Sequence, residues 1–127
     1  MGHVLVIDDD KNVLELIKVL LERINCSVTT TENAKDVKKL VSDNKYDLVV
    51  TDLLIPDMDG LEVIKLVKSV HKDMKIIAIT GGYSAYTPVM LNVAKSLGAE
   101  TVFRKPLPVN DFLSTVKSLM DELPIKN

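Results

Sequence analysis

Apolar residues follow two alternating patterns along this chain. Short, continuous runs rich in β-branched residues are typical of buried strands, and they alternate with segments in which an apolar residue recurs every three or four positions, as in amphipathic helices. This strict alternation predicts one α/β domain, a doubly wound, five-stranded parallel sheet with helices on both faces. The expected strands cover residues 4–7, 26–31, 48–52, 75–80 and 101–104.

The expected helices are bounded by residues that suit helix ends. Asp10, Asn33 and Asn110 stand where a side chain can accept a hydrogen bond from the first turn of the following helix. Asn25 and Gly98 follow helices and readily take the left-handed conformation that ends them. No repeat or linker interrupts the pattern, so we expect residues 1–127 to form a single domain.

Composition narrows the classes of function. A net charge of -2 over 127 residues gives little attraction to nucleic acid or to membrane surfaces. No apolar run reaches the roughly 18 residues that a membrane span needs, and the N-terminus lacks the features of a signal peptide. The single cysteine, Cys26, suits a reducing compartment. We therefore expect a cytoplasmic protein with no direct nucleic-acid or membrane partner.

Polar side chains stand just past the ends of four expected strands. Asp8 and Asp9 follow the first strand, Asp52 ends the third, Thr80 ends the fourth and Lys105 follows the fifth. Parallel strands end at the same edge of a sheet, so these side chains should converge. The crevice at that edge is where open α/β sheets bind ligands.

The residue types at this edge indicate phosphoryl chemistry. Two carboxylates about 4 Å apart repel by roughly 4 kcal/mol at an effective dielectric near 20, so a cluster of Asp8, Asp9 and Asp52 calls for a cation. Oxygen ligands favour a hard ion, Mg²⁺ or Mn²⁺. Lys105 offsets a further charge and could bind an anion beside the metal. Asp52 is then well placed as a nucleophile that forms an acyl phosphate.

Four motifs, each preceded by a strand, carry a family resemblance. On residues 6–10, 52–60, 79–81 and 105–106, the chain resembles the receiver domains of the response-regulator superfamily, which are CheY-like, over essentially its whole length. The resemblance implies a flavodoxin-like fold with strand order 2-1-3-4-5. Because the sequence ends about where such a fold ends, we expect a single receiver domain without an output domain, and a stand-alone regulator is favoured over a piece of a longer protein.

The resemblance assigns roles to the acids. Asp52 would accept a phosphoryl group from a sensor histidine kinase or a phosphotransfer protein. Asp9, Asp52 and the main-chain carbonyl of Leu54 would ligate Mg²⁺ directly, and Asp8 would act largely through water. Such a protein is a switch rather than an enzyme, apart from its own phosphorylation and dephosphorylation.

The resemblance also implies how the switch is read. Thr80 and Lys105 would each hold a phosphoryl oxygen, and the bond between Lys105 and Pro106 would be cis, which is cheap only before proline. A change at Thr80 would alter the face formed by the fourth helix, fifth strand and fifth helix for a downstream protein partner. We expect a monomer or a weak homodimer.

Some positions depart from the usual pattern or serve the backbone. The segment from Thr80 to Lys105 is a few residues longer than is usual in the family. The loop that begins with Gly81 and Gly82 is the expected place of the extra residues. Val102 stands where an aromatic switch residue is common, three positions before the lysine. Gly60 is expected to meet a backbone requirement at the start of the third helix.

Two other classes of function are open alternatives. A phosphatase resembling the haloacid dehalogenases would use Asp8 as its nucleophile within Asp8-Asp9-Asp10, but the threonine expected downstream is Asn12. A receiver-like interaction module that takes no phosphoryl group would have little reason to keep the acid set. Nucleotide binding is disfavoured because no glycine-rich loop follows the first strand.

Overall fold

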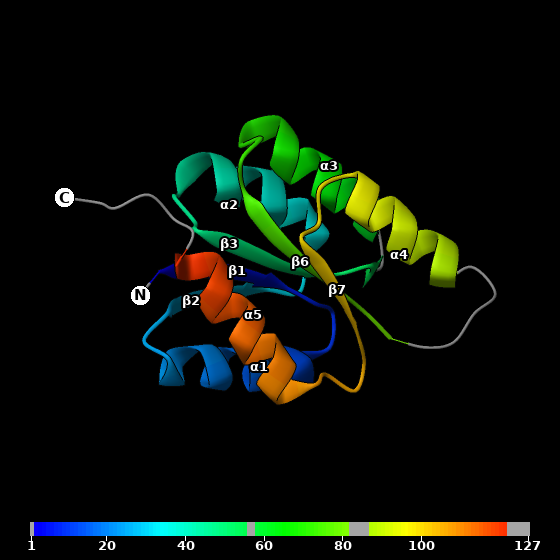
Figure 1. Ribbon diagram of the computed structural model, residues 1–127. Helices are drawn as coiled ribbons and strands as arrows, with labels where there is room; N and C mark the ends of the chain where they lie inside the picture. Colours follow the sequence, from blue (N-terminus) through cyan, green and yellow to red (C-terminus); the bar gives the residue numbers. More distant parts are fainter. Residues whose placement is uncertain (1, 56–57, 82–86, 122–127) are drawn as a thin grey trace.

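The computed structural model describes residues 2–55, 58–81 and 87–121 and has the expected alternation of strands and helices (Figure 1). Its main sheet contains five parallel strands in the order β2-β1-β3-β6-β7, which confirms the predicted fold class and strand order. These strands are β1 (His3–Ile7), β2 (Ser27–Thr31), β3 (Leu48–Asp52), β6 (Lys75–Thr80) and β7 (Thr101–Arg104).

Helices connect these strands, and three short elements were not predicted. A 3₁₀ turn precedes the second helix, and a two-residue antiparallel pair of strands, β4 with β5, lies between β3 and the third helix. None of the helices in the described part of the chain has the length and apolar character needed to cross a bilayer. The remaining elements are α1 (Lys11–Arg23), η1 (Ala34–Asp36), α2 (Val37–Asp43), β4 (Leu54–Ile55), β5 (Met58–Asp59), α3 (Gly60–Val70), α4 (Thr87–Ser96) and α5 (Val109–Asp121).

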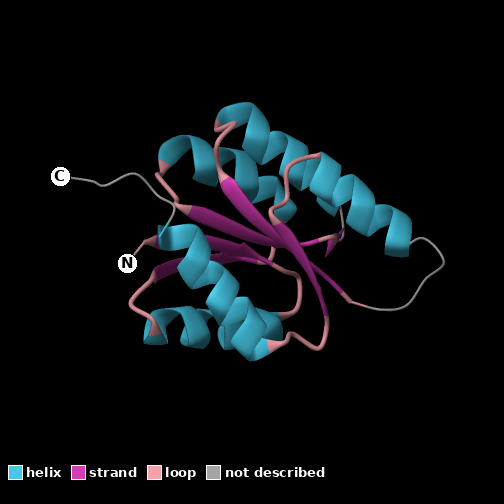
Figure 2. Ribbon diagram, in the orientation of Figure 1, coloured by secondary structure: helices cyan, strands magenta, loops and turns pink. Residues whose placement is uncertain are grey.

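The sheet forms the middle of three layers. Helices α1 and α5 cover one face, and α2, α3 and α4 cover the other (Figures 1 and 2). Each face has its own apolar cluster of buried side chains. The central strand β3 is buried along its whole length, so burial of its apolar residues holds its carboxyl end at the middle of the sheet edge.

The structure confirms three of the predicted helix-end residues, Asp10, Asn25 and Gly98, and places a fourth, Asn33, before a 3₁₀ turn. The Asp10 side chain accepts a hydrogen bond from the Asn12 N–H at 2.9 Å and caps α1, as predicted. Asn25 has a φ of 68° and Gly98 a φ of 117°, which confirms both as left-handed helix ends. Asn33 caps the 3₁₀ turn η1 rather than an α-helix.

One predicted cap is wrong. Helix α5 begins at Val109, so Asn110 lies inside the helix rather than before it. The Phe112 N–H donates to the carbonyl of Pro108 at 2.8 Å, which places Pro108 directly before the helix, at the N-cap. Proline is tolerated at the start of a helix because a backbone N–H there has no partner within the helix.

Candidate functional site

Strands β1 and β3 bring the three predicted acids together. The strands pair in parallel with Ile7 opposite Thr51, so the residues that follow emerge side by side at the same edge. One carboxylate oxygen from each of Asp8, Asp9 and Asp52 lies within 4.8 Å of the others. Asp8 and Asp52 are buried, at 1% and 3% exposure, whereas Asp9 is exposed to solvent. The cluster is therefore open on the Asp9 side.

Lys105 reaches this cluster from the end of β7. Its Nζ donates to Asp52 Oδ2 at 2.8 Å and lies 3.0 Å from Asp8 Oδ2. Burial alone would lower the pKa of Lys105, but the bonds to Asp52 and Asp8 outweigh it and raise that pKa above 10.5. The ammonium is therefore charged at neutral pH and supplies the positive charge that the acids require.

The backbone around Lys105 explains how the side chain arrives there. The Lys105 N–H donates to the Thr80 carbonyl at 2.8 Å, and the Lys105–Pro106 bond is cis, as the resemblance implied. A Cβ at Gly81 would lie 3.1 Å from the Lys105 Cδ, closer than ordinary side-chain contacts. A glycine at position 81 therefore leaves room for the lysine stem to pass toward Asp52.

The Asp52 carboxylate is held at both oxygens. Its Oδ2 accepts from Lys105, and its Oδ1 accepts from the Leu54 N–H at 2.8 Å. This backbone donor was missed at the sequence level, because nothing in the residue type of Leu54 marks the direction of its N–H. The two bonds fix the orientation of the carboxylate at the end of β3.

The segment after Asp52 is closed by a glycine. The Gly60 N–H donates to the Leu53 carbonyl at 3.2 Å, and a Cβ at Gly60 would overlap the backbone of Leu53. Glycine is the residue that permits such a close approach of two backbones. The backbone role predicted for Gly60 is thereby confirmed, since α3 begins in direct contact with the end of β3.

Asp8 has one partner at each carboxylate oxygen. Its Oδ1 accepts from the Asp10 N–H at 2.9 Å, and its buried Oδ2 lies 3.0 Å from the Lys105 ammonium, which Asp52 shares. Burial raises the pKa of Asp8 to about 6, against the lowering effects of the Asp10 N–H and Lys105. Three acids and one lysine leave an excess of two negative charges. An all-oxygen donor set with this excess fits a hard divalent cation.

We expect the Asp8→Asn variant to be more stable than the wild type by about 1–3 kcal/mol at pH 7 in the absence of metal. The pKa of Asp8 is raised in the folded state, which means that the charged carboxylate destabilises the fold and that a neutral amide removes this cost. The folded protein binds this proton more tightly, so the wild type loses stability as the pH rises from about 4 through 6. The difference should therefore vanish below pH 4. Urea unfolding in chelator at both pH values measures it, and a less stable variant at pH 7 would contradict the argument.

The other predicted residues lie nearby or outside the described residues. Thr80 is buried at the end of β6, beside Lys105. Val102 is half-buried and packs on the α2/α3/α4 side of the sheet, whereas its neighbour Phe103 packs on the opposite side, edge-on to Phe112 with ring centroids 5.9 Å apart. Phe103 therefore does not replace an aromatic side chain at position 102. Gly82 lies outside the described residues.

Comparison with known proteins agrees with this fold and site. The sequence model of the response regulator receiver domain family matches residues 4–117. The NtrC transcriptional regulator of Azospirillum brasilense is 30% identical over 118 residues, which are 93% of this chain and 24% of that protein. This chain belongs to the response regulator receiver domain family.

Two solved structures show the same architecture. A CheY-like receiver domain protein from Methanospirillum hungatei is 27% identical, with a TM-score of 0.86 over 96% of this chain and 95% of that one. The response regulator TrrA of Thermotoga maritima, in complex with Mg²⁺ and beryllium fluoride, is 32% identical, with a TM-score of 0.81 over 94% and 99%. The chain spans between 24% and 54% of the length of the curated relatives it matches first.

Proposed function

We propose that this chain is a phosphorylation-activated switch of two-component signalling, in which Asp52 accepts a phosphoryl group from a sensor histidine kinase or a phosphotransfer protein. The observation that carries the proposal is the position of the Asp52 carboxylate, 2.8 Å from Lys105 Nζ and within a cluster of two further acids. The relative TrrA, bound to Mg²⁺ and beryllium fluoride, supports it.

In the proposed transfer, an Asp52 oxygen forms a bond to phosphorus while the bond between phosphorus and the histidine nitrogen of the donor breaks. The nitrogen keeps the electron pair, and the product is an acyl phosphate. Lys105 and the Thr80 hydroxyl each hold a phosphoryl oxygen. Mg²⁺, or Mn²⁺, held by Asp9, Asp52 and the Leu54 carbonyl, with Asp8 acting through water, would neutralise charge on the phosphoryl oxygens.

The signal ends by hydrolysis at the same site. A water oxygen forms a bond to phosphorus, the bond between phosphorus and Asp52 breaks, and the carboxylate and inorganic phosphate are released. The chain turns over no separate substrate in this scheme. Its output is a change of surface rather than a product.

The proposed output surface is formed by α4, β7 and α5. Thr80 ends β6, and the chain then continues toward α4, so a shift of Thr80 toward a phosphoryl group is passed to that helix. Val89 and Val93 on α4 are 60% and 37% exposed, and exposed apolar side chains of this kind suit the docking of a downstream protein. Cys26 is a buried free thiol, which supports a reducing, cytoplasmic setting.

The test is phosphorylation by a small molecule. With Mg²⁺ and a low-molecular-weight phosphodonor, the intact mass is expected to rise by one phosphoryl group, and with chelator in place of Mg²⁺ it should not rise. Intact-mass spectrometry measures both. No gain of mass in the presence of Mg²⁺ would overturn the proposed function.

A further inference from the structure

Strand β2 leaves one row of backbone groups exposed at the edge of the sheet. Among the described residues it pairs with β1 alone. The Ser27 N–H donates to the Gly2 carbonyl at 2.8 Å, and the Thr31 carbonyl accepts from the Asp8 N–H at 3.2 Å, so Ser27 and Thr31 face β1. In a parallel ladder alternate residues face alternate sides, which turns the N–H and C=O groups of Val28 and Thr30 outward.

The two edges of the sheet differ in how far they discourage pairing. The edge strand β7 ends in Arg104, followed by Lys105 and Pro106, and such charges and prolines oppose the addition of another strand. Strand β2 reads Ser-Val-Thr-Thr-Thr, without charge or proline and rich in β-branched residues. This edge therefore has the composition of a strand that accepts a partner.

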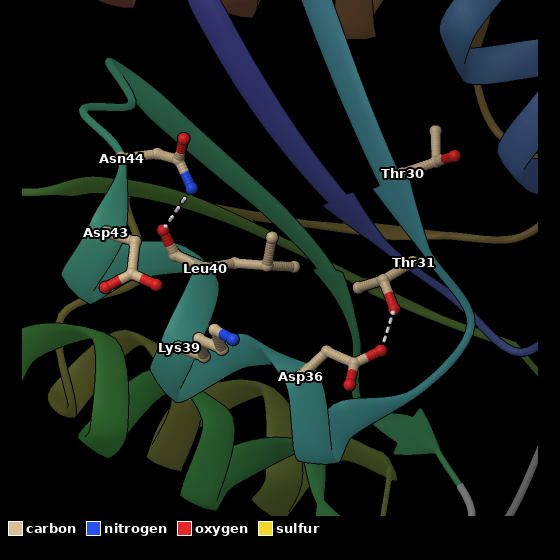
Figure 3. Close-up of a pocket in the computed structure, with 7 residues that line it drawn as sticks. All are labelled: Thr30, Thr31, Asp36, Lys39, Leu40, Asp43 and Asn44. Atoms are coloured by element: carbon tan, nitrogen blue, oxygen red, sulfur yellow. Dashed lines mark hydrogen bonds between the residues drawn. The ribbon is translucent and has the colours of Figure 1, made fainter.

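A pocket lies on each face of the β2 edge. The pocket beside α2 has a volume of about 400 Å³ and includes Asp36, Lys39 and Asp43. Figure 3 shows Thr31 turned toward Asp36, to which its hydroxyl donates at 3.3 Å, and Thr30 turned away from α2. The pocket beside α1 has a volume of about 250 Å³. An added strand would have room for its alternate side chains on both faces of the sheet.

Both pockets contain both signs of charge. Asp36 and Asp43 stand with Lys39 on the α2 side. On the α1 side two acids, Glu15 and Glu32, stand with two lysines, Lys11 and Lys18. A surface with both signs can offer opposite charges to a copy of itself across a two-fold axis, which is what an isologous interface requires.

We propose that β2 pairs in antiparallel fashion with β2 of a second copy of this chain, so that one continuous sheet crosses the dimer. The outward groups set the register, with Val28 opposite Thr30 of the second copy and the two-fold axis at Thr29. Each Val28–Thr30 pair exchanges two backbone hydrogen bonds, which gives four in total. Thr29 faces its own counterpart, and the β-branched side chains form favourable cross-strand pairs.

This dimer is separate from the proposed phosphorylation switch. β2 and β7 are opposite edges of the sheet, so pairing through β2 leaves α4, β7 and α5 free for another partner. Dimer formation should therefore be the same in the Asp52→Asn variant as in the wild type. Failure of one proposal is thus distinguishable from failure of the other.

Analytical ultracentrifugation of the full chain over a wide concentration range gives the first test. The wild type is expected to show a monomer–dimer equilibrium. Thr30→Pro removes the outward N–H from each copy, and therefore two of the four bonds, without disturbing the pairing of β2 with β1. It should weaken association about thirtyfold. Thr30→Val keeps the N–H and should still dimerise, and a wild type that stays monomeric at every concentration would overturn the proposal.

Disulfide trapping tests the register independently. Residues directly opposite each other in a non-hydrogen-bonded antiparallel pair have Cα atoms about 4.5 Å apart, within the range that a disulfide spans. Thr29→Cys should therefore form a reducible dimer under mild oxidation. Val28→Cys should not, and the wild type, with only the buried Cys26, provides the background. A dimer that Thr30→Pro leaves intact and Thr29→Cys does not trap would place the contact elsewhere and refute the proposal.

Discussion

The Asp52→Asn variant is expected to take up no phosphoryl group under conditions in which the wild type takes up one. The amide is nearly the same size and can still accept the Leu54 N–H, but it lacks the charged oxygen that would attack phosphorus and that Lys105 contacts at 2.8 Å. The expected change is all or none, because Asp52 is the acceptor in the proposed transfer. Intact-mass spectrometry with Mg²⁺ and a small phosphodonor measures it.

A matched control shows whether the loss of phosphorylation is specific to Asp52 or follows the removal of any acidic side chain. Asp121 is an exposed acid at the end of α5, so Asp121→Asn should be phosphorylated like the wild type. Circular dichroism should show that Asp52→Asn is folded. Equal mass gain in Asp52→Asn and in the wild type would assign the phosphoryl group to another residue.

Lys105→Met is expected to lower the free energy of unfolding by about 2–3 kcal/mol in metal-free protein at pH 7. The substitution leaves the side chains of Asp8 and Asp52, which are 2% and 4% exposed, without their counter-charge, and stranding buried charges is costly. This figure is smaller than the roughly 3–5 kcal/mol lost when a fully buried pair is broken, because the lysine side chain is 25% exposed and partly screened. Because the raised pKa of Lys105 lies above 10.5, its contribution is fully present at pH 7 and is lost only at more alkaline pH.

Added Mg²⁺ should restore most of the stability lost in Lys105→Met, since a cation among the acids replaces the missing charge. Urea unfolding with chelator and with Mg²⁺ measures both effects. Lys95, an exposed lysine on α4, provides the comparison, and Lys95→Met should change stability by less than about 0.5 kcal/mol. A metal-free Lys105→Met protein as stable as the wild type would show that the lysine does not balance the acids.

Most of the fold was predictable because apolar periodicity and burial coincide here. The run from Leu48 to Val50 is apolar at every position and is fully buried in the central strand. The three elements that the pattern did not predict, η1, β4 and β5, are each two or three residues long and too short to show a periodicity. The wrong cap at Asn110 arose because Pro108 offered a competing start to the same helix.

The convergence of the charged residues was predictable for a different reason. Asp8, Asp52 and Lys105 each stand at the end of a parallel strand, and topology alone brings such positions to one edge. The details depend on backbone directions that residue types do not encode. Examples are the Leu54 N–H on Asp52 and the Asp10 N–H on Asp8. Residue types likewise gave no sign of the paired pockets beside β2.

The contact between Gly60 and Leu53 has a consequence for how this protein can vary. It holds together the two ends of the segment that leaves β3 and enters α3, so the number of residues between them does not set the separation of strand and helix. Lengthening a loop whose two ends are held together adds only a modest cost in conformational entropy. Insertions between Ile55 and Met58 should therefore leave this contact in place, and with it the end of β3 that carries Asp52.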